Sequence, residues 1–179
     1  MDPHLGELQQ QIADAVSGLD VEQLTWHVPG KWSVAEILEH LYLTYTGTIK
    51  GCGRLLAADK LMVSGPTLKN RMQSLIVVGL GYMPSGRKSP EVARPRGLAA
   101  GKVAGEVEGK IREMDAALAQ VAGRFGTRAK VLDHPLLGPF SVGQWRKFHL
   151  VHGLHHVKQI RRLREQLPSP ASQAALAEK

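Results

Sequence analysis

Four of the eight histidines of this 179-residue chain fall within eight consecutive positions near its C-terminal end. His152 and His156 are four residues apart, so a helix would place them on one face, one turn apart. His149 extends the same stripe by a further turn, whereas His155 lies to one side of it. Neutral imidazole is a good ligand for zinc, nickel or ferrous iron, and two histidines at this spacing can share one ion. The spacing therefore predicts a divalent-metal site.

The histidine stripe borders the apolar face of its helix, because most of its neighbours are apolar: Trp145, Phe148, Val151, Ile160 and Leu163. Several unpaired imidazoles at such a place would be costly unless they bind something. Two ligands rarely hold an ion, and helical bundles complete their metal sites with side chains from a facing helix. His40, at the margin of an earlier apolar stripe, is the predicted third ligand.

Two segments together resemble the paired signature of the DinB-like superfamily of metal-binding four-helix bundles. The first, WSVAEILEHL, spans residues 32–41 and has the form WSxxEIxxHL. The second, HGLHHVKQI, spans residues 152–160 and has the form HxxHHxxQI. The resemblance extends over roughly residues 5–167.

This resemblance implies that His40, His152 and His156 form a metal triad. It also implies that His155 is a neighbour of the site and that Gln159 supports a ligand or the packing between helices. The family includes thiol-dependent S-transferases and isomerases that use low-molecular-weight thiols, beside many members of unknown activity. The resemblance thus identifies a metal site better than it identifies a substrate.

Three histidines leave at least one coordination position open, which is typical of catalytic metal sites. A divalent ion can lower the pKa of bound water, polarise a carbonyl or keep a thiolate deprotonated. We therefore expect a metal-dependent enzyme of the S-transferase or hydrolase type, acting on a small-molecule substrate with a thiol or water. The alternative is a bundle that binds a metal or a small ligand without catalysis.

Other polar residues near the two segments have simpler interpretations. His149 is a candidate proton carrier, but a hydrogen-bonded core histidine is the preferred interpretation. His134 precedes a proline in a predicted turn, where it would make a local hydrogen bond or line a pocket. Glu36 is explained by helix capping, and Glu39 lies about 100° around the helix from His40, so it should point elsewhere.

Apolar residues that recur at steps of three and four predict four long helices, over residues 5–19, 33–58, 103–121 and 141–167. Ser33 and Glu36 have the form of a capping box, which defines the start of the second helix. A shorter helix is predicted from Pro66 to Val78. Residues 79–101 are rich in proline and glycine, which predicts a long irregular crossover loop.

These elements predict an all-α fold, a four-helix bundle of the DinB-like type with a long crossover connection between helices two and three. No alternating run is long enough to predict a strand, and residues 133–139 are interpreted as a turn. We expect a single domain over residues 1–167, followed by a flexible C-terminal tail over residues 168–179.

The composition, with 43% hydrophobic and 22% charged residues, is that of an ordinary globular domain large enough to fold without disulfides. Cys52 is the only cysteine, which excludes an internal disulfide and a thiolate zinc site. Without a basic and apolar leader or a run of about 18 apolar residues, we expect a cytoplasmic protein that does not cross a membrane.

A formal charge of +7 permits anionic partners but does not require them. The basic residues at positions 158, 161, 162 and 164 spread around the outer side of the last helix, without interleaved aromatic residues. We therefore do not expect nucleic-acid binding. Four basic residues of the crossover loop, Arg87, Lys88, Arg94 and Arg96, could attract an anionic substrate to a pocket mouth. A homodimer is compatible with a helical bundle, although no heptad seam specifies it.

Overall fold

Six α-helices and one β-hairpin make up the described part of the chain, which in this computed structural model comprises residues 1–61, 63–84 and 89–168. The helices are α1 (Pro3–Val16), α2 (Val21–Thr25), α3 (Val34–Ala58), α4 (Leu68–Ser74), α5 (Ala100–Phe125) and α6 (Val142–Glu165). Two short turns, the π-helical η1 (Leu75–Gly79) and the 3-10 helical η2 (Glu91–Ala93), lie between α4 and α5. The strands are β1 (Lys130–His134) and β2 (Gly138–Ser141).

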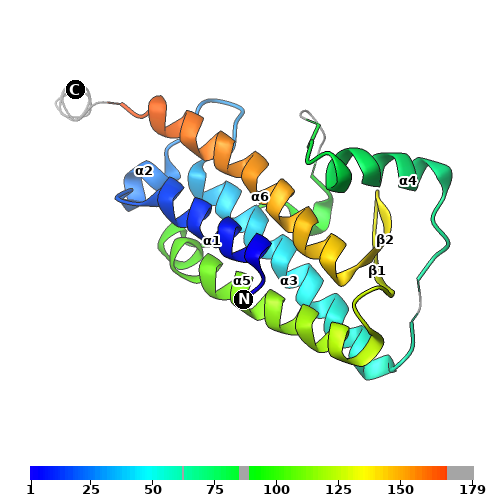
Figure 1. Ribbon diagram of the computed structural model, residues 1–179. Coiled ribbons are helices and arrows are strands. Elements are labelled where there is room, and N and C mark those ends of the chain that lie inside the picture. The colour runs from blue at the N-terminus through cyan, green and yellow to red at the C-terminus, as the bar shows by residue number, and fades with distance from the viewer. Residues whose placement is uncertain (62, 85–88, 169–179) are drawn as a thin grey trace.

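Helices α1, α3, α5 and α6 lie lengthwise beside one another, and the hairpin and α4 lie together at one end of them (Figure 1). Packing is most extensive between α3 and α5 and between α1 and α6. The apolar stripes predicted from the sequence meet in one core, whose fully buried members include Leu8, Ile12, Leu38, Ile111 and Leu118. None of the described helices combines the length and the apolar composition needed to cross a bilayer.

The two helices that carry the histidines begin at well-defined residues. Ser33 Oγ accepts from the Glu36 backbone amide at 3.2 Å, and the Glu36 carboxylate accepts from the Ser33 amide at 2.8 Å. The predicted capping box is therefore confirmed. An equivalent box between Ser141 and Gln144 starts α6. Because a helix turns by a constant angle per residue, each cap also defines the direction of the histidines that follow.

The prediction of a purely helical fold is wrong in one respect, because residues 130–141 form an antiparallel hairpin. Its strands have five and four residues, which is too short for an alternating pattern to stand out. Pro139 lies within β2, and a proline inside a short run argues against a strand. The glycine at the turn, Gly138, has a φ of 79°, which allows the chain to reverse at this point.

Three further boundaries differ from the prediction. The predicted helices leave residues 20–32 unassigned, but this segment contains α2, which a capping box between Asp20 and Gln23 starts. Thr67 caps α4, so this helix begins after Pro66, and α4 passes into the π-helical η1. The segment predicted as an irregular crossover loop holds η2 and ends where α5 begins at Ala100. The predicted tail lies outside the described residues from position 169 onward.

A glycine in the histidine segment sets how closely α1 approaches α6. A Cβ on Gly153 would lie 2.1 Å from Leu8 Cδ1, a separation that no pair of carbon atoms tolerates. Leu8 is fully buried at the centre of α1, so it has little room to move. The contact between these helices therefore requires glycine at position 153.

We predict that Gly153→Ala lowers the free energy of unfolding by about 2 kcal/mol, because the added methyl overpacks the α1–α6 contact. Gly105→Ala is the matched control, since a Cβ at this exposed position of α5 meets no atom within 4 Å. The control should raise stability by about 0.5 kcal/mol through its better helix propensity. Chemical denaturation measures both effects, and a Gly153→Ala variant as stable as the control would contradict the packing.

Candidate metal centre

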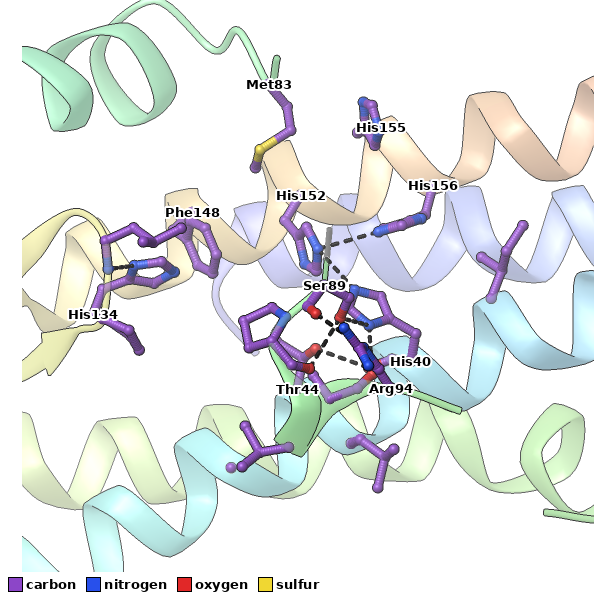
Figure 2. A pocket seen from close by; sticks show the side chains of 18 of the residues that line it. His40, Thr44, Met83, Ser89, Arg94, His134, Phe148, His152, His155 and His156 are labelled. Carbon is purple, nitrogen blue, oxygen red and sulfur yellow. Dashed lines mark hydrogen bonds between the residues drawn. The ribbon is translucent and has the colours of Figure 1, made fainter. Parts of the chain in front are cut away.

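Three imidazole rings converge between α3 and α6 (Figure 2). His152 Nε2 lies 3.1 Å from His40 Nε2 and 3.2 Å from His156 Nε2. The ligand atoms that the three rings offer all lie within 4.8 Å of one another. His40 and His156 are buried, and His152 is partly exposed. The structure thus brings together the three residues predicted as ligands, although His40 and His152 are 112 positions apart in sequence.

The hydrogen bonds of two rings determine which nitrogen carries the proton. His40 Nδ1 lies 2.7 Å from the Ala93 carbonyl oxygen, and His156 Nδ1 lies 2.8 Å from Gln159 Oε1. Both partners can only accept, so each Nδ1 must donate. In a neutral imidazole the other nitrogen then has a free lone pair. The Nε2 lone pairs of His40 and His156 therefore face His152 in the space between the helices.

The third ring has a different environment. His152 stacks on Phe148 with an interplanar angle of 7°, which holds the plane of its ring. Its Nδ1 is buried and has no hydrogen-bond partner among the described residues. Its Nε2 faces two nitrogens that both carry lone pairs, and a proton on it could satisfy only one of them at a time.

This donor set fits a cation. Ligand nitrogens about 2.0–2.1 Å from a tetrahedral zinc lie about 3.3–3.4 Å apart, close to the separations of 3.1 and 3.2 Å found here. Neutral nitrogen donors suit zinc, nickel or ferrous iron. The Nδ1 hydrogen bonds of His40 and His156 are the outer contacts that commonly orient metal-binding histidines.

Electrostatics keep these rings in the neutral form that a metal requires. Burial, with a smaller contribution from repulsion by His40 and against the opposing effect of the Gln159 hydrogen bond, lowers the pKa of His156 to about 3. Burial also lowers the pKa of His152 well below its usual value, with added repulsion from His156. Burial lowers the pKa of His40 as well, against a smaller opposing effect of the Ala93 hydrogen bond. At neutral pH the lone pairs are therefore available without prior loss of a proton.

The rings lie on the wall of a cavity of about 1190 Å³. Much of the remaining wall is apolar, and includes Trp32, Ile37, Met83, Val92 and Phe148. Arg94 also lines the cavity, but it pairs with Glu91 and donates to the Ser89 carbonyl. Of the basic residues predicted to attract an anion, Arg87 and Lys88 lie outside the described residues.

The remaining histidines of interest have local roles. His149 is 0% exposed and its Nε2 lies 3.0 Å from Thr48 Oγ1, which is the contact of a hydrogen-bonded core histidine. His134 lines the cavity, and its Nδ1 accepts from two backbone amides of its hairpin turn. His155 lies outside the group of three and contacts Gln159 Nε2 at 3.2 Å.

A residue whose position the sequence did not reveal is Glu39, which was expected to point away from His40. It does not line the cavity on whose wall the three rings lie, but it is only 1% exposed. Its carboxylate accepts hydrogen bonds from three successive backbone amides, those of residues 96–98. Helical spacing carries no signal of this contact, because its partners are main-chain groups at least 57 positions away.

The burial of His149 predicts that stability depends on pH. Its pKa is lowered to about 3 by burial, so below pH 6.5 the unfolded chain binds a proton that the folded chain does not. Stability is therefore lost as the pH falls from 6.5 toward 3. Between pH 7 and 5, we expect His149 to account for a loss of about 2 kcal/mol.

His149→Gln keeps an N–H group for Thr48 but does not titrate, so it should show a correspondingly smaller loss between pH 7 and 5. Denaturant unfolding of both proteins in a chelator measures the difference. Equal pH slopes for the two proteins would show that His149 is not held neutral by the fold.

The sequence matches the model of a known protein family. The family model described as DinB superfamily matches residues 4–160, a stretch that includes all three converging histidines. No curated protein and no solved structure matches the chain. The helical architecture and the buried histidine group agree with this match. The chain belongs to the DinB superfamily.

Proposed function

We propose that His40, His152 and His156 bind one divalent metal ion, and that the site belongs to an enzyme that activates a thiol or a water molecule. The substrate is a small molecule, and the reaction is S-transfer or hydrolysis. The observation that carries the proposal is the meeting of three Nε2 atoms at 3.1 and 3.2 Å, two of them with lone pairs defined by their Nδ1 hydrogen bonds.

The residues around the triad hold its rings in the binding orientation. Ala93 keeps the Nδ1 proton of His40 on the side away from His152. Gln159 accepts from His156 through Oε1 and contacts His155 through Nε2, so its amide is held at both ends. Phe148 stacks on His152 and limits its rotation. A site organised in this way loses little freedom when it binds an ion.

When bound, a divalent ion would lower the pKa of a coordinated thiol or water and polarise a carbonyl group. The residues of the chain would supply the rest of the site. The cavity of about 1190 Å³ exceeds the usual range of 300–1,000 Å³ for one drug-sized ligand. It has room for a small substrate together with a low-molecular-weight thiol, and its apolar walls would exclude bulk water.

We also propose that the fold is a DinB-like four-helix bundle, in which the segment between α3 and α5 is the crossover. Family membership and the four helices of 14 or more residues support this assignment. The single cysteine suits a reducing cytoplasm.

One observation favours the alternative, a bundle that binds a metal or small ligand without catalysis. Two carboxylates line the described part of the cavity, and both are engaged elsewhere. Glu36 accepts from the Ser33 amide in the helix cap, and Asp133 accepts from the Ser64 amide. A general base would then have to be a histidine, the substrate's own group or a water.

We predict that protein purified without an affinity tag binds about one divalent ion per chain after exposure to zinc, nickel or ferrous iron. His40→Ala and His156→Ala should each weaken binding at least 100-fold, because two ligands remain. His27→Ala is the control, since His27 is exposed and absent from the cavity wall. Elemental analysis and chelator competition measure binding, and a wild-type protein that takes up none of these ions would contradict the proposal.

The enzymatic part of the proposal has a separate test. We expect the metal-loaded protein to show turnover in a panel of thiol-transfer and ester-hydrolysis reactions, and His156→Ala to lower that rate at least 100-fold. Turnover that persists in His156→Ala would place the chemistry elsewhere. Stoichiometric metal binding without turnover in the panel would favour the non-catalytic alternative.

A further inference from the structure

Glu39, the residue directly before His40, is a buried carboxylate without an ion-pair partner among the described residues. Its Oε1 accepts from the Arg96 amide at 2.7 Å, and its Oε2 accepts from the Gly97 and Leu98 amides at 3.1 and 3.0 Å. Burying a carboxylate is costly unless hydrogen bonds replace its water. These three amides supply that replacement, so Glu39 and the segment that bears them are mutually dependent.

The segment that Glu39 holds also contacts the metal centre. We refer to residues 89–98 as the strap. The Ala93 carbonyl in the strap accepts from His40 Nδ1 at 2.7 Å, so two successive residues of α3 bind the strap at two points. Ser89 Oγ of the strap also lies 3.3 Å from His40 Nδ1, whereas most side chains of the strap are exposed, including Val92 at 75%.

A proline makes the strap stiff between its two points of attachment. Pro95 stands between Ala93 and the amides that Glu39 binds, and its ring restricts its own φ angle. It also keeps Arg94 out of the helical region, and Arg94 is extended in the structure. A stiff connection of this kind transmits the position of residues 96–98 to the Ala93 carbonyl.

We propose that Glu39 is a positioning residue for the metal centre. By holding residues 96–98, it keeps the Ala93 carbonyl on His40 Nδ1. That contact keeps the proton on Nδ1 and directs the Nε2 lone pair of His40 toward His152 and His156. The consequence for metal affinity rests on the proposed function, whereas the consequence for His40 itself does not.

Glu39→Gln tests the proposal, because it keeps the size of the side chain but replaces an acceptor with a donor that would face backbone amides. In metal-free protein, the His40 Nδ1–H signal in an imidazole NMR spectrum should shift or broaden through exchange with water. In chelator competition, zinc affinity should fall about tenfold, which is the usual effect of losing an outer contact to a ligand.

Leu118→Ala controls for a general loss of stability, because Leu118 is fully buried in α5. It should lower the free energy of unfolding. It should leave the position and width of the His40 Nδ1–H signal unchanged and the zinc affinity within twofold of that of the wild type. An effect of Leu118→Ala on His40 equal to that of Glu39→Gln would overturn the proposal, since any destabilisation would then suffice.

A second pair of variants changes the strap itself and leaves Glu39 in place. These variants test the proposal even if Glu39→Gln does not fold. Gly97 is exposed, has a φ of 85°, and a Cβ there would meet no atom within 4 Å. Gly97→Ala therefore acts only through the conformation of the strap. Gly18→Ala is its match, because Gly18 lies between α1 and α2, has a φ of 74°, is also exposed, and a Cβ there would meet no atom within 4 Å.

We expect Gly97→Ala to change the His40 signal and to weaken zinc binding severalfold, and Gly18→Ala to do neither. An unchanged His40 signal in Glu39→Gln and Gly97→Ala overturns the positioning role, whether or not the wild type binds zinc. Failure of the wild type to bind zinc overturns the proposed function instead. In that case the His40 signal of the metal-free variants still decides the role of Glu39.

Discussion

The proposed site depends on three imidazole nitrogens that lie close together, because His40 Nε2 and His156 Nε2 lie 3.1 and 3.2 Å from His152 Nε2. Neutral imidazoles carry one proton each, and two of the three protons are committed to Ala93 and Gln159 on the outer side. The inner side then holds more lone pairs than protons. Such an arrangement is unfavourable by itself and becomes favourable when a cation is shared among the rings.

Several features of the fold act together to maintain this convergence. The capping boxes at Ser33 and Ser141 define where the two histidine-bearing helices begin. The absence of a side chain at Gly153 allows α6 to lie close against α1, while α3 packs along α5. A three-way contact in which Arg146 pairs with Asp115 and Asp2 joins α6 to α5 and to the start of α1. The positions of the rings thus follow from contacts made throughout the helical core.

The parts of this arrangement that could be predicted are those with a local periodic signal. The long helices follow from apolar stripes, and the pair His152 and His156 follows from a spacing of one helical turn. His40 followed from the need for a third ligand on a facing helix and from the DinB-like motif. Membership of the DinB superfamily was also predictable, because both motif segments are intact.

The rest could not be predicted because it depends on contacts between distant segments. The hairpin has strands too short to show alternation, and it contains Pro139. From the sequence, Glu39 cannot be distinguished from a glutamate on the solvent-exposed side of a helix. It is a buried hydrogen-bond acceptor because the backbone amides of the strap bind its carboxylate. The carbonyl that orients His40 belongs to the main chain of Ala93, and every residue type has such a group, so the sequence does not reveal this contact.

X-ray absorption spectroscopy of the zinc-loaded protein reports the atoms around the ion without regard to activity, so it tests whether the three histidines bind the ion. We expect a zinc environment with three histidine nitrogens at about 2.0–2.1 Å and outer-shell scattering typical of imidazole. We also expect one histidine contribution to disappear in His40→Ala. A zinc spectrum dominated by oxygen ligands, or one unchanged in His40→Ala, would show that the ion does not bind to these three rings.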